Sequence, residues 1–315
     1  MIPDPAPFLA AHGWQNAELT PFSADWSARR YARLRRIGEP EQAILMQTAP
    51  DTDFHAFIRV ATILRNLDAS APVIYAVEEK LGMLLLEDFG DRNFGRLIDG
   101  GTDAEPLLHR AVVTLAEMQR RYASQVPLAS TVRRYDTPAF LDLLSPLLDN
   151  FVYPDAPAAH ASLTDTWTKL LTPLETQPHS LMLRDFIADN LMDLPTRHGW
   201  QAVGILDFEL AGIGPVVYDF ASLTEQVRRD IPDAVRDRLI AHYLAAHPEI
   251  DPTLFRTTLP IMAVHRHLRI FARLQKMNKP DFHQRVHLYL RQLLPHPALH
   301  SAQTWCQTFL PQYFA

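Results

Sequence analysis

Three polar residues in the second half of the chain have the types and spacing that phosphoryl transfer requires. Asp185 is followed by Asn190 in the pattern Arg-Asp-x-x-x-x-Asn, and Asp207 comes directly after the apolar run 202–206. Transfer of a phosphoryl group from a metal-bound nucleotide needs one carboxylate that orients the attacking hydroxyl and accepts its proton. It also needs oxygen ligands that hold Mg²⁺ against the phosphates. Asp185 fits the first role, and Asn190 and Asp207 fit the second.

A β-hairpin is the element that can bring Asp207 beside the loop that carries the other two residues. Residues 191–194 read as one strand, residues 195–199 as a Pro/Gly turn, and the apolar run as the second strand. A hairpin with solvated acids is the simpler interpretation. The additional Asp-Phe at the strand end and the later pair Tyr218-Asp219 favour a catalytic segment.

The whole chain has the composition of a globular protein that works on small molecules. Its 315 residues, 47% of them hydrophobic, suffice for one large domain or two modest ones. A net charge of −6 argues against nucleic acid as a partner. The single cysteine, Cys306, the absence of a signal-peptide pattern and the absence of a membrane-length apolar run predict a cytoplasmic protein without a membrane partner.

The segment from Ser180 to Asp219 resembles the catalytic core of the aminoglycoside phosphotransferase and choline kinase family, relatives of the protein kinases. Within that family it is most similar to bacterial sugar kinases that phosphorylate the anomeric hydroxyl of N-acetylmuramate and N-acetylglucosamine. The resemblance implies an α+β, two-lobed, protein-kinase-like fold. A small antiparallel-sheet lobe, residues 1–89, would bind the nucleotide, and a larger, mainly helical lobe, residues 90–315, would carry catalysis and the acceptor.

The same resemblance implies ATP and Mg²⁺ as cofactors, a small-molecule substrate as the partner, and a role in cell-wall recycling. It also makes Asp219 a structural residue that ties the catalytic loop from below, with Arg184 as a further support. A buried carboxylate that accepts backbone N–H groups is physically sensible in that place. Leu183 departs from the family pattern, which usually has histidine there, and puts the positioning of the loop in question.

The segment 19–34 is similar to the phosphate-covering hairpin of the sugar kinases. Ser27, Arg29, Arg30 and Tyr31 match its D-x-S-x-R-R-Y motif. A hydroxyl and local N–H groups can donate to phosphate oxygens, and arginine adds charge. The loop contains no glycine, unlike that of protein kinases, and an ordinary hairpin with exposed arginines is the alternative interpretation.

Two further features bear on nucleotide binding. Met46, in the predicted strand 43–46, stands where a protein kinase has its phosphate-pairing lysine, and the following helix, 52–67, has no glutamate in its first half. Asp88-Phe89-Gly90 spells the metal-binding motif of protein kinases but precedes Asp185 instead of following it. We therefore interpret this stretch as the hinge between lobes, where backbone groups of Glu87, Asp88 and Phe89 bind the adenine edge.

Candidate acceptor ligands lie at Glu209 and in the predicted helix 255–274. Arg266, Arg269 and Arg273 are spaced i, i+3 and i+7, which places them on one helical face. Such a row can bind the carboxylate of an acidic sugar, although an arginine stripe is more often a solvated face.

Apolar periodicity predicts the remaining elements. Strands are expected at 74–77 and 83–86, and helices at 8–13, 105–122, 138–151, 158–171, 220–229, 232–246, 288–294 and 305–314.

The leading hypothesis is an ATP- and Mg²⁺-dependent kinase of a small-molecule hydroxyl, most simply an amino sugar. A kinase of an aminoglycoside, choline or a homoserine-like alcohol stays open, as does a nucleotide-binding pseudokinase without turnover. The acceptor, the choice between ATP and GTP, and the oligomeric state are open as well, a monomer being plausible.

Overall fold

The computed structural model describes residues 3–22, 29–38, 41–48, 54–124, 132–151, 157–275, 277 and 280–314. Its internal contacts divide the chain into two compact units. The N-terminal unit comprises residues 1–102 together with 189–210, and the helical unit comprises 103–188 together with 211–315. The assignment of nucleotide binding to residues 1–89, and of catalysis and acceptor binding to residues 90–315, stays a prediction.

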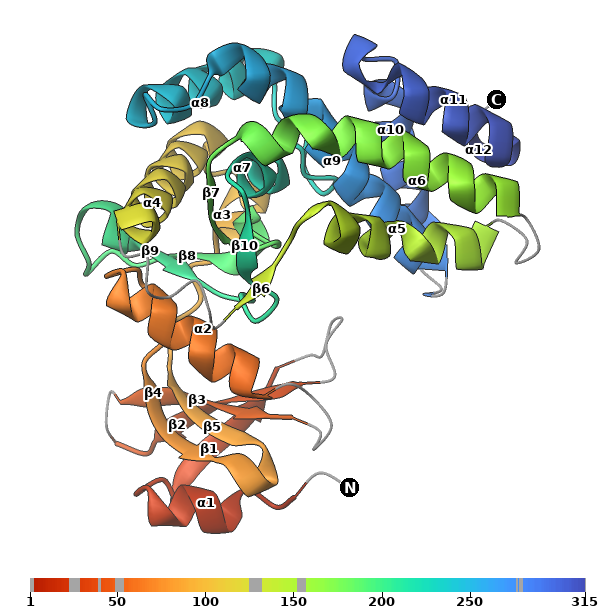
Figure 1. Ribbon diagram of the computed structural model, residues 1–315. Coiled ribbons are helices and arrows are strands. Elements are labelled where there is room, and N and C mark those ends of the chain that lie inside the picture. The colour runs from red at the N-terminus through yellow and green to blue at the C-terminus, as the bar shows by residue number, and fades with distance from the viewer. Residues whose placement is uncertain are drawn as a thin grey trace. The chain divides into compact units, whose positions relative to one another are not determined.

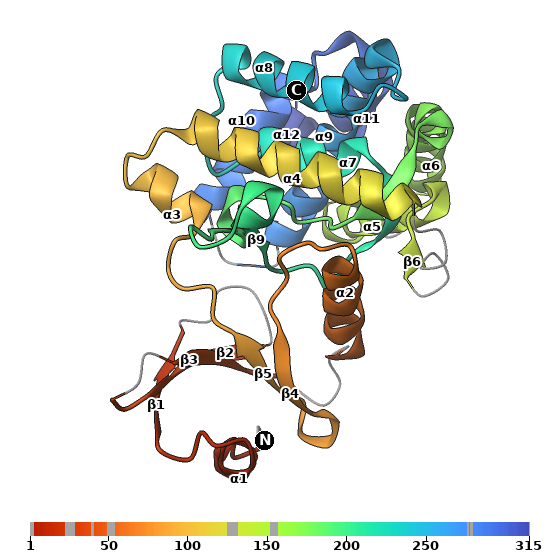
Figure 2. The ribbon, with the colours of Figure 1, turned by 90° about the vertical axis from the view of Figure 1, so that its left-hand side faces the viewer.

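A five-stranded antiparallel sheet forms the N-terminal unit, in the order β1-β2-β3-β5-β4. Figure 2 shows α1 and α2 on opposite sides of this sheet. The elements are α1 (Ala6–Ala11), β1 (Ala17–Pro21), β2 (Arg30–Arg36), β3 (Gln42–Gln47), α2 (Phe54–Asn66), β4 (Ile74–Glu78), β5 (Met83–Glu87) and α3 (Phe94–Asp99).

Burial on both sides explains the apolar character of the central strands. Ala43 and Leu45 of β3 join a buried cluster with Phe8 and Trp14. Met46, the next residue along β3, is also fully buried. Successive strand residues point to opposite faces, so a strand covered on both faces reads as a continuous apolar run.

The predicted hairpin is confirmed as β8 (Leu191–Asp193) paired antiparallel with β9 (Val203–Ile205). Although it follows part of the helical unit in sequence, it belongs to the N-terminal unit, where Ser70 bridges Gly204. A Cβ atom at Gly204 would lie 2.8 Å from ring atoms of Phe89, so this strand packs there only with glycine.

The helical unit is built around α9, which packs against α5, α7 and α10 (Figure 1). A small sheet in the order β6-β10-β7 completes it. Its elements are α4 (Ala104–Ser124), β6 (Arg133–Arg134), α5 (Thr137–Phe151), α6 (Pro157–Leu171), β7 (His179–Met182), β10 (Gly212–Pro215), α7 (Val217–Thr224), α8 (Asp233–Ala246), α9 (Pro252–Gln275), α10 (Pro280–Leu293), α11 (His300–Phe309) and α12 (Pro311–Phe314). Short 3₁₀ helices occur in both units, at Glu79–Leu81, Thr172–Thr176, Ala188–Asn190, Gly199–Ala202 and Pro297–Leu299.

The mixed fold class, with an antiparallel sheet in the N-terminal region and a mainly helical remainder, is confirmed. The helix predicted at 220–229 is wrong at both ends, because α7 spans Val217–Thr224. Every residue of α7 is buried, so it carries no amphipathic stripe that could mark its ends. The helix predicted at 305–314 is two helices, α11 and α12, with Pro311 starting the second. Within the described residues, no helix is long and apolar enough to cross a bilayer.

Candidate active site

The loop after β7 carries Asp185 on a turn that Asp219 holds from beneath. Arg184 adopts a left-handed backbone conformation with φ of 73°, which costs free energy for a residue with a side chain. The fully buried Asp219 carboxylate, in the first turn of α7, accepts the Leu183 N–H at 2.6 Å and the Arg184 N–H at 2.8 Å. These two hydrogen bonds stabilise a strained backbone directly before Asp185.

Burial determines the charge of Asp219. Desolvation raises the pKa of this carboxyl to about 7, although the two N–H donors act in the opposite direction, and the nearby negative charge of Asp185 adds to the rise. Its surroundings match the supporting role that the resemblance implied for Asp219.

The Arg184 side chain has its own support in Tyr135. Its Nη1 donates to Tyr135 Oη at 3.0 Å, and its guanidinium lies over the Tyr135 ring. Gly212 makes room for this ring, because a Cβ there would lie 2.6 Å from it. Nothing in the local sequence around Tyr135 indicated this role, which depends on a partner 49 residues away.

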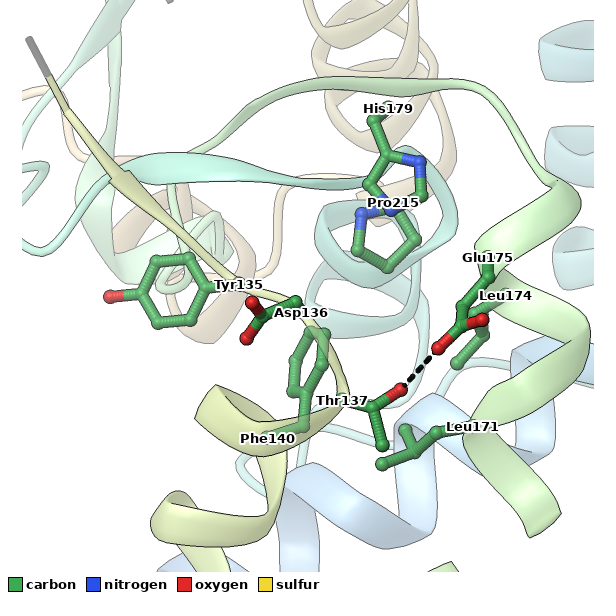
Figure 3. A pocket seen from close by; sticks show the side chains of 9 residues that line it. All are labelled: Tyr135, Asp136, Thr137, Phe140, Leu171, Leu174, Glu175, His179 and Pro215. Atoms are coloured by element: carbon green, nitrogen blue, oxygen red, sulfur yellow. Dashed lines mark hydrogen bonds between the residues drawn. The ribbon is translucent and has the colours of Figure 1, made fainter. Parts of the chain in front are cut away.

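Tyr135 is also one of nine residues that line a small pocket of the helical unit (Figure 3). Its other polar lining residues are Asp136, Thr137, Glu175 and His179. The Thr137 Oγ1 donates to Glu175 at 2.8 Å. None of the nine is a predicted site residue, so we do not assign the acceptor to this pocket.

Asp185 itself is bound by an arginine of α9. Arg266 Nη2 donates to Asp185 Oδ1 at 3.1 Å; the Arg266 side chain is 5% exposed, and that of Asp185 is 32% exposed. Burial alone would raise the pKa of the Asp185 carboxyl, but the charges of Arg266 and Arg269 and the Arg266 hydrogen bond outweigh it. The pKa is therefore below its usual value, and Asp185 is ionised at neutral pH.

The predicted row of arginines on α9 is not a uniformly solvated face. Arg266 is buried, Arg269 is half-buried and Arg273 is exposed. Arg266 therefore contacts the predicted catalytic residue directly, a relation across 81 residues of sequence that spacing along the helix does not reveal.

Asn190 and Asp207 lie together in the N-terminal unit. The Leu206 N–H donates to the Asn190 carbonyl at 2.9 Å, and Asn190 Nδ2 donates to Asp207 Oδ2 at 3.3 Å. Asp207, past the end of β9, has a positive φ of 57° and an exposed side chain. An amide oxygen and a carboxylate are ligands that suit Mg²⁺, which usually keeps water and phosphate oxygens in its other positions.

The donor set is thus a sparse one. Among the described ranges, no group of three or more His, Cys, Asp or Glu side chains could hold a metal ion.

Two residues predicted for different ligands form an ion pair with each other. Arg29 Nη1 donates to Glu209 Oε1, and both side chains are largely buried. Burial lowers the pKa of the Arg29 guanidinium, but the charge and hydrogen bond of Glu209, together with Tyr31 and Asp207, outweigh it, so that the pKa is raised. A guanidinium has five N–H donors, so Arg29 can pair with Glu209 and still offer donors to another anion.

The other residues of the predicted phosphate motif have different surroundings. Burial raises the pKa of the neighbouring Tyr31 well above its usual value, whereas Arg30 is exposed. Ser27 lies outside the described residues.

The predicted hinge is held by two arginines that the sequence did not single out. Arg33 of β2 donates to both Asp88 oxygens, at 2.6 and 3.0 Å, and the Gly90 N–H donates to Asp88 as well. Arg197 pairs with Glu87 and lies over the Phe89 ring. Because Asp88 already has these partners, its carboxylate is a poor candidate for a metal ligand, in agreement with the hinge interpretation.

Comparisons with known proteins agree with this fold. A solved structure, the GDP complex of the aminoglycoside 2′-phosphotransferase-IIIa F108L mutant, superposes with a TM-score of 0.65 at 12% identity, covering 93% of this chain and 97% of that chain. This likeness shows the protein-kinase-like fold that aminoglycoside phosphotransferases and choline kinases share.

The fold and the sequence matches together define a small-molecule kinase. The profile of the phosphotransferase enzyme family matches residues 18–253, and the chain belongs to that family. It is 30% identical to the N-acetylmuramate/N-acetylglucosamine kinase of Caulobacter vibrioides, over 97% of this chain and 96% of that protein. It is 28% identical to the protein of the same name from Pseudomonas putida, over 84% of this chain and 79% of that protein.

Proposed function

We propose that this phosphotransferase uses ATP and Mg²⁺ to phosphorylate a hydroxyl of an amino sugar, N-acetylmuramate or N-acetylglucosamine, at the anomeric position. The observation that carries the proposal is the state of Asp185. It is an ionised, partly exposed carboxylate on a turn held by Asp219 and oriented by Arg266. Such a group can orient an alcohol and accept its proton.

On the acceptor side, Asp185 accepts a hydrogen bond from the attacking hydroxyl and takes its proton as the phosphoryl group leaves the nucleotide. A carboxylate with a lowered pKa is a weak base, so its main contribution is orientation of the hydroxyl, with proton transfer late in the reaction. The proton ends on Asp185 and then passes to solvent, which reaches its partly exposed side chain.

On the nucleotide side, Asn190 and Asp207 would hold Mg²⁺ through their side-chain oxygens. When bound, the cation neutralises charge on the nucleotide phosphates and stabilises the charge that develops during transfer. Arg29, Arg30, Tyr31 and Ser27 are proposed to contact the phosphates. Backbone groups of Glu87–Phe89 are proposed to contact the adenine.

The surroundings of Asp185 favour a neutral or acidic acceptor over a cationic one. Arg184, Arg266 and Arg269 all lower its pKa by their positive charge. A polycationic aminoglycoside or choline would be repelled by the same charges unless acidic residues intervened. We propose the cytoplasm as the site of the reaction, since ATP is available there and the buried free thiol of Cys306 suits a reducing compartment.

A panel of acceptors with ATP and Mg²⁺ tests this function. We expect steady ADP release that depends on N-acetylmuramate or N-acetylglucosamine, and none that depends on kanamycin or choline. ADP release only with a cationic acceptor would show that the substrate is a cationic alcohol and not an amino sugar. Tight nucleotide binding without acceptor-dependent release would favour a pseudokinase, the interpretation that the buried Met46 in place of lysine supports.

A further inference from the structure

Three guanidinium groups surround the Asp185 carboxylate in the helical unit, and two of them have protein partners. Arg184 donates to Tyr135, and Arg266 donates to Asp185. The third, Arg269, has neither a hydrogen-bond acceptor nor an ion-pair partner among the described residues, and its Nε is buried. A half-buried cation without an acceptor is costly, because it has lost much of its hydration.

The charges around Arg269 do not balance. Desolvation lowers its pKa, the positive charges of Arg184 and Arg266 act in the same direction, and Asp185 and Tyr218 oppose them without reversing the shift. Asp219, the other carboxyl nearby, already accepts two backbone N–H groups. The remaining groups add no negative charge, since burial lowers the pKa of both His265 and His267 to about 3 and leaves them neutral.

We propose that Arg269 binds the carboxylate of an acidic acceptor beside Asp185, and that it thereby selects an acidic over a neutral sugar. This inference rests on the proposed function and assigns one residue to its acceptor specificity. A guanidinium offers two parallel N–H donors to a carboxylate, which is the strongest form of this contact. Arg266 is unsuited to the same task, because its bond to Asp185 makes it a positioning residue.

A transferring or product phosphate group is the other anion that a free guanidinium could meet. The two anions are distinguishable. The transferred phosphate is present in the reaction with every acceptor, whereas the carboxylate is present only with N-acetylmuramate. N-acetylglucosamine lacks the lactyl ether of N-acetylmuramate and is otherwise the same sugar, so the two form a matched pair.

The test compares kcat/KM for both sugars in the wild type, Arg269→Gln and Arg269→Lys. Loss of one charge-assisted contact predicts a fall of about 10- to 100-fold for N-acetylmuramate in Arg269→Gln. Any loss that arises from the charge of Asp185 is common to both sugars, so kcat/KM for N-acetylglucosamine should fall less, and the ratio of the two values should drop. Arg269→Lys should be intermediate, since it keeps the charge and loses the fork. Arg256→Gln, on the same helix but exposed and 3.6 Å from Asp237, is the control and should change neither sugar.

Equal losses for both sugars would overturn the proposal and assign Arg269 to the phosphate or to the charge balance of Asp185. Calorimetric binding of N-acetylmuramate to wild type and Arg269→Gln gives a second readout without turnover. Arg269-dependent binding without ADP release would reject the proposed kinase function and keep the anion site. ADP release with both sugars, without any effect of Arg269 on the preference between them, would keep the kinase function and reject the anion site.

The melting temperature checks that the variant folds and separates a binding role from a structural one. Removing a cation that has no protein partner should leave the melting temperature equal or higher, as is common for residues kept for function. A marked fall would indicate a structural role and count against the proposal.

Discussion

Replacing Arg266 by glutamine should weaken the kinase most at low pH. Arg266 donates its hydrogen bond to Asp185 from a side chain that is 5% exposed, and it is the largest favourable influence on the ionised form of that carboxylate. Without Arg266, burial is opposed by less positive charge, since Arg269 and Arg184 remain but the Arg266 charge and hydrogen bond are lost. The pKa of Asp185 should therefore rise in the variant, and a larger fraction of the enzyme should be protonated and inactive in acid.

The size of the effect follows from the contact. A hydrogen bond to a charged group contributes about 1.5–3 kcal/mol, and the lower value applies here because Asp185 is partly exposed. Since 1.36 kcal/mol corresponds to one pKa unit, the acid limb of the pH profile should move up by roughly one unit. The loss of orientation should also lower kcat at all pH values, by about tenfold.

The assay is kcat/KM for N-acetylglucosamine from pH 4.5 to 8 in the wild type, Arg266→Gln and Arg266→Lys. We expect the acid limb of Arg266→Lys to lie between the other two, because lysine keeps the charge but not the planar geometry. An acid limb at the same pH in all three proteins would refute the reasoning, since it would show that Arg266 does not control the ionisation of the group that limits the rate.

Three further predictions concern other parts of the account. Asp219→Asn should lower kcat by about 10- to 100-fold, because an amide can accept only one of the two backbone N–H groups and the turn before Asp185 relaxes; an unchanged kcat would contradict this. Asp207→Ala should abolish the Mg²⁺ dependence of nucleotide binding measured by calorimetry, and a retained dependence would remove Asp207 from the metal site. Glu225, directly after α7, pairs with Arg236 at 2.6 Å, but burial outweighs this ion pair and raises the pKa of Glu225 to about 7. The folded state therefore holds a proton that the unfolded state loses above about pH 4.5, and stability falls as pH rises from there to 7. Glu225→Gln should show a shallower fall in melting temperature over that window, and identical slopes would count against it.

Local signals accounted for most of the secondary structure. The turn residues at 195–199 and the flanking apolar runs predicted the β8–β9 hairpin, and helix periodicity predicted α4 and α9 to within a few residues. These signals are contained in short windows of sequence. The α7 boundaries were missed because a helix buried on every side has no periodic pattern to read.

The pairing of site residues could not be predicted in the same way. Arg29 and Glu209 are 180 residues apart, and Arg266 and Asp185 are 81 apart, so each partner is decided by the fold alone. The sequence identified all four residues as candidates from their types and motif positions. It predicted separate ligands for Arg29 and Glu209, whereas the structure joins them in one ion pair.

The sequence did not identify supporting residues outside the recognised motifs. Arg33 donates to Asp88, and Tyr135 accepts from Arg184, but neither lies near its partner in sequence. A strained residue such as Arg184 needs surrounding contacts to keep its conformation, and such contacts come from whichever elements pack nearby.

Comparison of the wild type with Asp185→Asn tests the central claim most directly. ADP release with N-acetylglucosamine, ATP and Mg²⁺ should fall by about 10²- to 10⁴-fold in the variant, while the affinity for ATP stays the same. An Asp185→Asn protein that kept most of its acceptor-dependent ADP release would contradict the assignment of this carboxylate as the group that orients and deprotonates the hydroxyl.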